Sequence, residues 1–209
     1  MLNDANKAKI AVFVSGGGTN LQALIDAQTK QILKHGKISL VVSNNSEAYA
    51  LVRANMAGIP TKIITKKDYS SQIEFEDAII AALGEAEIDF IVLAGFMTIL
   101  TEHFTSKYPK RIINVHPSLI PAFCGKGYYG LKVHEAALSY GVKISGATVH
   151  YVNEVPDGGE IILQKAVIVR KDETPESLQM RIMRQAEWQI LPRAAEMISK
   201  EIYLQNKNK

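Results

Sequence analysis

The chain has 209 residues, of which 47% are hydrophobic and 22% are charged, and this composition is typical of one soluble globular domain with a substantial core. The net charge of +3 is slight and no basic stripe is interleaved with aromatic residues, so a nucleic-acid partner is not indicated, whereas a small anionic substrate would suit this charge equally well. With one cysteine, Cys124, and with neither a secretory signal nor a run near the roughly 20 apolar residues of a membrane helix, we expect a cytoplasmic protein without disulfides.

Short β-branched runs alternate with amphipathic stretches through the first half of the chain. The runs predict five strands, at residues 10–14, 38–42, 62–64, 90–93 and 112–115. Helices are predicted between them: one with Leu21, Leu24 and Ile25 inward, one at about residues 47–56, and one at about residues 71–83 with Ile73, Ala78, Ile79, Ala82 and Leu83 inward. This order indicates an α/β fold with a mostly parallel, doubly wound, Rossmann-like sheet.

The second half of the chain follows a different pattern. Strands at residues 145–152 and 161–169 flank an Asp-Gly turn, which predicts an antiparallel hairpin at the sheet edge. A glycine-containing loop precedes a helix at about residues 132–139. The last helix is predicted to begin at Thr174-Pro175 and to run to about Glu196 with a kink at Pro192, followed by a frayed polar tail from Lys200. We expect one domain over residues 1–209, with its core at about 9–198.

Residues 15–20, Ser-Gly-Gly-Gly-Thr-Asn, connect the first predicted strand to the first predicted helix. Backbone N–H groups at such a helix start attract phosphate, and glycines let a ligand approach the backbone closely. A plain tight turn is the alternative, but three successive glycines weaken a first helical turn, so we favour the phosphate site. Leu21 stands where a dinucleotide fingerprint has its third glycine, and no P-loop lysine follows. The loop therefore predicts a mononucleotide or sugar-phosphate ligand.

Asn114 and His116 stand two residues apart at the end of the fifth predicted strand. This spacing points both side chains the same way, at the sheet edge where open α/β folds bind ligands. An isolated histidine is more often structural, and Asp157 alone would be a turn residue because Asp-Gly is a common turn dipeptide. Together, an amide to hold a carbonyl oxygen, an imidazole to move protons and a carboxylate to hold the imidazole form a candidate acyl-transfer site. Such a site needs neither a metal nor a side-chain nucleophile.

The remaining candidates carry weaker signals. Residues 94–100 end the central strand in an apolar, glycine-hinged loop, which is either ordinary core or a surface for a flat aromatic ligand. Nothing marks Cys124 as an activated nucleophile, and no His/Cys/Asp spacing resembles a zinc site. His103 and His134 are predicted on helix surfaces, whereas His150 is predicted to face the site.

Four motifs, at residues 15–23, 93–97, 114–121 and 155–159, occur here in a specific order and spacing. With them, the chain from Ile10 to about Pro192 resembles the phosphoribosylglycinamide formyltransferases of the folate-dependent formyltransferase superfamily. The resemblance implies transfer of a formyl group from 10-formyltetrahydrofolate, as co-substrate, to the primary amine of glycinamide ribonucleotide in de novo purine biosynthesis. It implies no metal.

The resemblance also implies binding roles for individual residues. It places the substrate phosphate at Gly18, Thr19 and Asn20, and the substrate ribose at Glu187. It places the folate at Met97, Thr98, Ile99, Leu100, Asn114, Asn153, Glu154, Val155, Pro156 and Asp157. Two departures stand out: many members carry an arginine where this chain has Gln72, and the loop at residues 122–130 is longer than the shortest family versions.

Asn114, His116 and Asp157 are the catalytic residues that the resemblance implies. Asn114 would donate a hydrogen bond to the formyl oxygen, and a protonated His116 would stabilise the same negative charge and carry protons between the two nitrogens. Asp157 would orient the imidazole and raise its pKa.

Three other interpretations remain open. Methionyl-tRNA formyltransferases share the Asn-x-His-Pro-Ser-Leu motif but add a C-terminal β-barrel domain, for which we expect no room after the last helix. Formyltetrahydrofolate hydrolases add an N-terminal regulatory domain, which we do not expect before the first strand, although their reaction differs only in letting water attack. A non-catalytic sensor of nucleotides or sugar phosphates would use the glycine loop, but it gives Asn114, His116 and Asp157 no reason to converge.

Overall fold

The computed structural model describes residues 4–207, built around a seven-stranded sheet in the order β3-β2-β1-β4-β5-β6-β7. The strands are β1 (Ala8–Val14), β2 (Gly36–Ser43), β3 (Thr61–Ile63), β4 (Phe90–Leu93), β5 (Ile112–His116), β6 (Ile144–Tyr151) and β7 (Ile161–Ile168). Strands β1 to β5 pair in parallel, whereas β6 pairs antiparallel with both β5 and β7. The predicted α/β fold with an antiparallel C-terminal hairpin is therefore confirmed.

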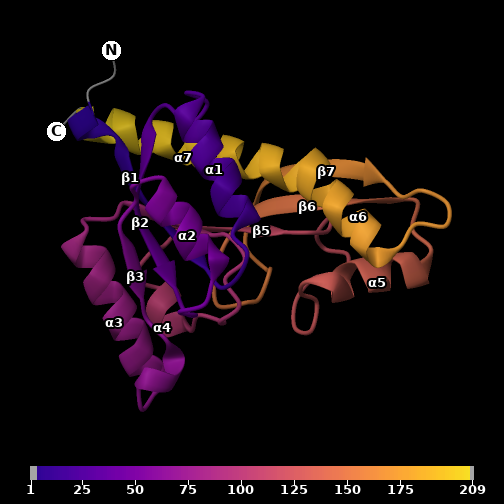
Figure 1. Cartoon of the computed structure of the whole chain (residues 1–209), viewed down its shortest axis with the longest axis horizontal. Coiled ribbons are helices and arrows are strands. Elements are labelled where there is room, and N and C mark those ends of the chain that lie inside the picture. Colours follow the sequence, from indigo (N-terminus) through magenta and orange to yellow (C-terminus); the bar gives the residue numbers. More distant parts are fainter. Residues whose placement is uncertain (1–3, 208–209) are drawn as a thin grey trace.

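Helices cover both faces of this sheet (Figure 1). They are α1 (Thr19–Thr29), α2 (Tyr49–Met56), α3 (Gln72–Glu85), α4 (Glu102–Thr105), α5 (Leu131–Tyr140), α6 (Pro175–Ile182) and α7 (Trp188–Lys207), with short 3-10 helices η1 (Asp4–Asn6) and η2 (Lys66–Asp68) and the π-helical segment η3 (Met183–Glu187). Among the described residues, none of these helices combines the length and the apolar character needed to cross a membrane.

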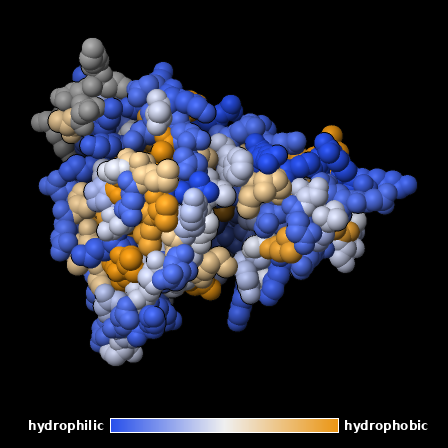
Figure 2. Space-filling view, viewed as in Figure 1, coloured by the Kyte–Doolittle hydropathy of each residue, from blue (hydrophilic) through white to orange (hydrophobic). Residues whose placement is uncertain are grey.

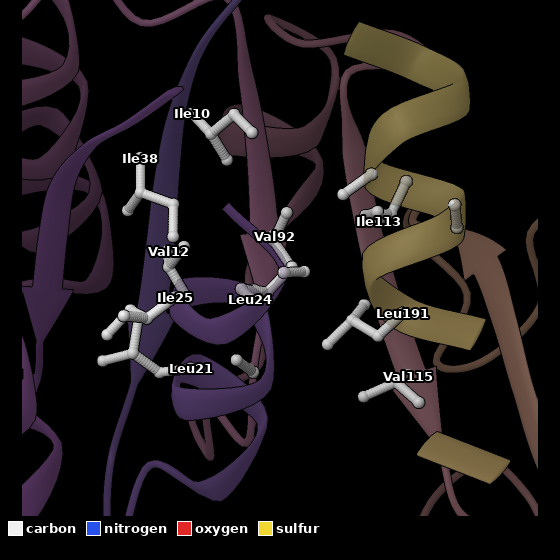
Figure 3. Packing of buried hydrophobic residues seen from close by; sticks show 14 of the residues in the cluster. Ile10, Val12, Leu21, Leu24, Ile25, Ile38, Val92, Ile113, Val115 and Leu191 are labelled. Atoms are coloured by element: carbon white, nitrogen blue, oxygen red, sulfur yellow. The ribbon is translucent and has the colours of Figure 1, made fainter. Parts of the chain in front are cut away.

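Strand β1 shows why both faces need cover. Ile10 and Val12 belong to an apolar cluster with α1 and α7, whereas Ala11 and Phe13 belong to a second cluster with α3 and α4. All four side chains are fully buried, so the strand is a continuous apolar run rather than an alternating one. Figure 3 shows the first cluster, with Ile10, Val12, Leu21, Leu24, Ile25, Ile38, Val92, Ile113, Val115 and Leu191 labelled.

The C-terminal helices differ from their prediction. The Thr174 side chain caps α6 as expected, accepting a hydrogen bond from the Ser177 N–H at 3.2 Å. We expected one helix with a kink at Pro192, but the α-helical pattern is interrupted earlier, at η3, and Pro192 lies inside α7. The predicted frayed tail from Lys200 is wrong as far as Lys207, because α7 continues there and buries Ile202 and Tyr203 against the core. Residues 208–209 lie outside the described part of the chain.

Helix α3 shows one further difference. Ser71 caps its start by accepting from the Glu74 N–H at 3.1 Å, in agreement with the predicted start near this residue. Ile73, however, is 54% exposed, and Phe75 is the buried aromatic residue in the first turns. The expected apolar face was therefore wrong at Ile73.

The carboxyl ends of the parallel strands bring together the segments that the sequence singled out. The glycine loop follows β1, residues 94–99 follow β4, and Asn114 and His116 lie in the second half of β5. Strands β1 and β4 are neighbours, but the chain continues from β1 to β2 on one side and from β4 to β5 on the other. The carboxyl edge between β1 and β4 is therefore the switch point at which such sheets bind ligands. At the opposite edge, η1 precedes β1 and contacts α7, so that the first and last of the described elements lie together (Figure 1).

Candidate active site

A cavity of about 1000 Å³ opens at the carboxyl edge of the parallel strands. It reaches from the glycine loop to the turn that carries Asp157, and Figure 2 shows the surface hollowed between the α2 side and the α5 side. Its walls are residues 16–20, 94–99, 114–117 and 125–130 together with Lys132, His134, Pro156, Asp157, Gln179, Met183 and Glu187. A cavity of this size can hold two small organic ligands side by side.

Asn114, His116 and Asp157 meet at one end of the cavity. His116 is 4% exposed, and its Nδ1 lies 3.5 Å from Oδ2 of Asp157. The other ring nitrogen, Nε2, lies 2.8 Å from the carbonyl oxygen of Phe123 and can donate to it. This contact favours the neutral tautomer with its proton on Nε2, so that Nδ1 carries the free lone pair on the Asp157 side.

His150 completes this group, as predicted from its place on β6. Its Nδ1 lies 2.8 Å from the carbonyl oxygen of Tyr151, and its Nε2 faces both the Asn114 amide nitrogen at 3.3 Å and Oδ1 of Asp157 at 3.5 Å. Strand register explains the encounter, because Asn114 of β5 pairs directly with His150 of β6. The second amide hydrogen of Asn114 faces Oδ1 of Asp157 at a long 3.5 Å, so it can turn to a carbonyl oxygen that enters the cavity.

Asp157 is held in place by backbone geometry. Its φ of 56° lies in the left-handed region, and its Oδ2 accepts from the Gly125 N–H at 2.8 Å. Gly159 follows, where a Cβ would lie 1.8 Å from the Tyr151 carbonyl oxygen, so only glycine lets the turn close against β6. The turn thus fixes the carboxylate between two imidazoles that come from β5 and β6.

The pKa values of His116 and Asp157 are both lowered in the fold. Burial lowers the pKa of His116, and the opposing influence of Asp157 and the Phe123 carbonyl does not overcome it. Asp157 thus raises the pKa of His116 as expected, but desolvation is the larger influence and the net shift is downward. Burial also opposes ionisation of Asp157, but hydrogen bonding from His150, the His116 charge and the Gly125 N–H together hold the pKa of this carboxyl below its usual value. A neutral imidazole beside an ionised carboxylate is thus the state expected near pH 7.

The glycine loop forms the other end of the cavity. Gly18 caps α1 with φ 71° and ψ 30°, and a Cβ there would lie 2.6 Å from Cβ of Ala50. A Cβ at Gly16 or Gly17 would meet nothing within 4 Å, so these two residues leave their backbone open to the cavity. Thr19 also lines the cavity at the first residue of α1, where unpaired N–H groups favour an anion.

Glu187 lies beside the end of the loop, in the π-helical segment η3. It is 4% exposed, and its Oε2 accepts from the Asn20 amide at 2.7 Å. Burial raises the pKa of Glu187 to about 7, and the Asn20 hydrogen bond opposes this shift. A carboxyl that is partly protonated near neutral pH can both donate and accept.

The predicted folate residues divide into two groups. Met97, Thr98, Ile99, Asn114, Pro156 and Asp157 line the cavity. Leu100 instead packs in the apolar cluster beneath the loop, and residues 153–155 are not among those that line the cavity. The loop is tied to its neighbours, since the Met97 N–H donates to Oγ of Ser15 at 2.8 Å and Thr98 accepts from Asn44 at 2.7 Å. Gln72 lies under the same loop, 3.4 Å from the Ile99 carbonyl oxygen.

His134 was wrongly predicted on a helix surface. It is 0% exposed, it lines the cavity, and neither of its ring nitrogens has a hydrogen-bond partner within residues 4–207. Burial, with a further contribution from His116, lowers its pKa to about 4. The signal that could have found it is its position beside Val133 and one turn before Ala137, which together form the buried face of α5.

The chain also resembles known proteins in its sequence. The chain matches the formyl transferase family over residues 8–195. It belongs to that family. The phosphoribosylglycinamide formyltransferase of Haemophilus influenzae is 44% identical over 184 residues, which cover 88% of this chain and 84% of that protein. The resemblance inferred from the four motifs is therefore confirmed.

Other family members extend the comparison. The human trifunctional purine biosynthetic protein adenosine-3 is 42% identical over 196 residues, 94% of this chain but 19% of that protein, so this chain spans about a fifth of the length of such relatives. Among solved structures, glycinamide ribonucleotide transformylase 1 from Symbiobacterium toebii superposes with a TM-score of 0.88 at 36% identity, covering 95% of this chain and 90% of that one. The sheet described above is thus shared with solved formyl transferases over nearly its whole extent.

Proposed function

We propose that the chain transfers a formyl group from 10-formyltetrahydrofolate to the primary amine of glycinamide ribonucleotide, giving formylglycinamide ribonucleotide and tetrahydrofolate in de novo purine biosynthesis. The observation that carries the proposal is the single cavity, which joins the glycine loop at one end to Asn114, His116 and Asp157 at the other. The relatives from Haemophilus influenzae and Symbiobacterium toebii are named for the same reaction.

In this proposal, the substrate binds at the glycine-loop end. The N–H groups at Gly18, Thr19 and Asn20 would hold its phosphate, because a helix start offers unpaired donors and a favourable dipole. Glu187 would bind the ribose, and its raised pKa lets the carboxyl donate to one ribose oxygen while it accepts from another.

The folate would lie along residues 94–99. Met97 and Ile99 are 58% and 66% exposed although both are apolar, so they present a ready surface for a flat ring. Thr98 and Pro156 complete this wall, and Leu100 would support the loop from the core. We assign Asn153, Glu154 and Val155 to the outer part of the folate, where the turn faces solvent.

The catalytic group would act on the formyl carbon between the two ligands. As the amine attacks, negative charge develops on the formyl oxygen, and the Asn114 amide is placed to donate to it. A new bond joins the formyl carbon to the substrate nitrogen, and the bond from that carbon to the folate nitrogen breaks. The free lone pair on Nδ1 of His116 can take the proton that the amine loses and return it to the departing nitrogen. Ionised Asp157 would stabilise the imidazolium that forms in between.

An assay with the purified chain tests the proposal. Formylated folate is supplied with and without glycinamide ribonucleotide, and both free tetrahydrofolate and formylated product are measured. Release of tetrahydrofolate only in the presence of the amine, with one formyl group appearing on it per folate released, is the expected result. Release without the amine would make the chain a hydrolase, and binding without any release would make it a sensor.

The single cysteine suits a reducing cytosol, and we propose that the reaction takes place there.

A further inference from the structure

Three successive carbonyl groups of the glycine loop point to the same side. The carbonyl oxygen of Ser15 accepts from the Asn45 side-chain amide at 3.2 Å, and that of Gly16 accepts from the Ala50 N–H at 3.0 Å. The carbonyl oxygen of Gly17 accepts from Nε of Arg53 at 2.9 Å. All three donors belong to α2 or to the segment just before it.

Because peptide groups are planar, the direction of each carbonyl also fixes the direction of the N–H group that follows it. In a trans peptide, the carbonyl of one residue and the N–H of the next point in opposite directions. The N–H groups of Gly16, Gly17 and Gly18 therefore point away from α2, toward the cavity that these glycines line. Successive N–H groups aimed at one place form a concave anion site.

Arg53 itself lies outside this cavity. Its side chain lines a second hollow on the outer surface, beside Thr19 and Trp188. Its guanidinium lies 5.0 Å from the centre of the Tyr49 ring, and its Nη1 donates to Oε1 of Gln22 at 3.1 Å. Arg53 therefore ties α1, α2 and the loop together without reaching a ligand in the large cavity.

The loop needs such a tie at Gly17. A Cβ at Gly16 or Gly17 would meet nothing within 4 Å, so packing does not hold either peptide in one orientation. The Gly17 carbonyl has a side chain as its donor, whereas the Gly16 carbonyl is held by helix backbone that a point substitution leaves in place. The Gly17–Gly18 peptide is thus held by a side chain, as the Ser15–Gly16 peptide is by Asn45, and a substitution can release it.

We propose that Arg53 is a positioning residue of the phosphate site: by holding the Gly17 carbonyl toward α2, it aims the Gly18 N–H at the substrate phosphate. This inference rests on the proposed function only for the identity of the phosphate carrier. Lysine cannot take over this role, because one ammonium group cannot reproduce the planar fork that bonds Gly17 and Gln22 together.

The test compares Arg53→Met and Arg53→Lys with Arg193→Met. Arg193 is an exposed arginine that lines the same outer hollow, so its loss removes the same charge from this side of the molecule. We expect both Arg53 variants to raise KM for glycinamide ribonucleotide about tenfold, which corresponds to the loss of about one hydrogen bond. The kcat and the KM for the formyl donor should stay within about twofold, and Arg193→Met should resemble the unsubstituted chain in all three constants.

A normal KM for the ribonucleotide in Arg53→Lys would overturn the proposal, because charge alone would then explain the role of Arg53. Equal losses in kcat and in both KM values would overturn it too, because they would indicate general damage to the fold.

A second readout does not depend on catalysis. Inorganic phosphate should raise the melting temperature of the unsubstituted chain and of Arg193→Met, and it should raise that of both Arg53 variants much less at the same concentration. If the chain transferred no formyl group but showed this pattern, the proposed function would fail and the role of Arg53 would stand. If transfer were normal and phosphate stabilised all four proteins equally, the role of Arg53 would fail alone.

Discussion

The two ends of the cavity are built from different parts of the polypeptide. At the glycine-loop end the groups offered to a ligand are mostly backbone N–H donors, whose direction is set by φ, ψ and the bonds to α2. At the other end they are the side chains of Asn114, His116 and Asp157, whose chemistry depends on which atoms carry protons. The first end should therefore be sensitive to backbone conformation, and the second to side-chain chemistry and pH.

The largest expected effect comes from removing a side chain at the second end. Asn114→Ala and His116→Ala should each lower kcat by about 10²–10³-fold or more, because a donor to the developing charge, or the proton carrier, is lost. Circular dichroism and the melting temperature should show that both variants remain folded. Near-normal turnover in either folded variant would refute the role given to that residue.

The second-largest effect is expected from the ionisation of Glu187. This carboxyl lies at the glycine-loop end, so it tests whether pH also matters at the end that is built mostly from backbone groups. A pKa raised from 4.5 to about 7 disfavours the ionised form in the folded chain by about 3 kcal/mol. As pH rises, Glu187 loses its proton in the unfolded chain before it does so in the folded chain. The contribution of Glu187 to the free energy of unfolding is therefore complete below pH 4.5 and is lost progressively up to about pH 7.

Glu187→Gln should remove this dependence. We expect the free energy of unfolding, measured with denaturant at pH 5 and pH 8, to fall less between these two pH values in the variant than in the unsubstituted chain. Parallel behaviour of the two proteins would show that Glu187 ionises normally in the fold.

A backbone change of smaller size tests the first end. Gly18→Ala places a methyl group 2.6 Å from Cβ of Ala50 at a residue with φ 71°, so we expect a loss of roughly 1–3 kcal/mol in stability and a higher KM for the phosphorylated substrate. Gly17→Ala is the matched control, since its new methyl group meets nothing within 4 Å. Equal effects of the two changes on stability would contradict the conformational argument.

The smallest effect is expected at Cys124, which lies beside the reactive end. Burial and the Asp157 charge raise the pKa of its thiol, so the thiolate is scarce near pH 7. Cys124→Ala should leave kcat within about twofold of that of the unsubstituted chain, because the proposed reaction makes no use of the thiol. A loss of a hundredfold would show that the reaction uses a side-chain nucleophile after all.

Much of the fold could be predicted because local signals agree with the tertiary structure. The β-branched runs became β1 to β5, and the Asp157-Gly158 dipeptide lies in the connection, residues 152–160, between the antiparallel strands β6 and β7. Asn114 and His116 were found because a spacing of two on a strand fixes a common direction. That Asp157 lies within 3.5 Å of both Asn114 and His116 is a long-range fact, to which the sequence contributed only through resemblance.

The features that could not be predicted depend on contacts between distant segments. His134 is buried because α5 packs against α6, and a ten-residue helix gives too weak a periodicity to show it. The end of α7 is ordered because Tyr203 meets the His35 ring at 5.0 Å, far away in sequence. The direction of the pKa shift of His116 required the balance of burial against charge, which only coordinates supply.

The meeting of η1 with α7 has a consequence for larger polypeptides. η1 and the last turns of α7 lie at the amino-terminal edge of the parallel strands, so polypeptide joined before β1 or after α7 would extend from the side remote from the opening where ligands enter. A domain of this kind can be joined to other domains at both ends without blocking the access of ligands to the cavity. The human trifunctional relative, in which the matching region makes up 19% of the length, is an architecture that this placement of the ends accommodates.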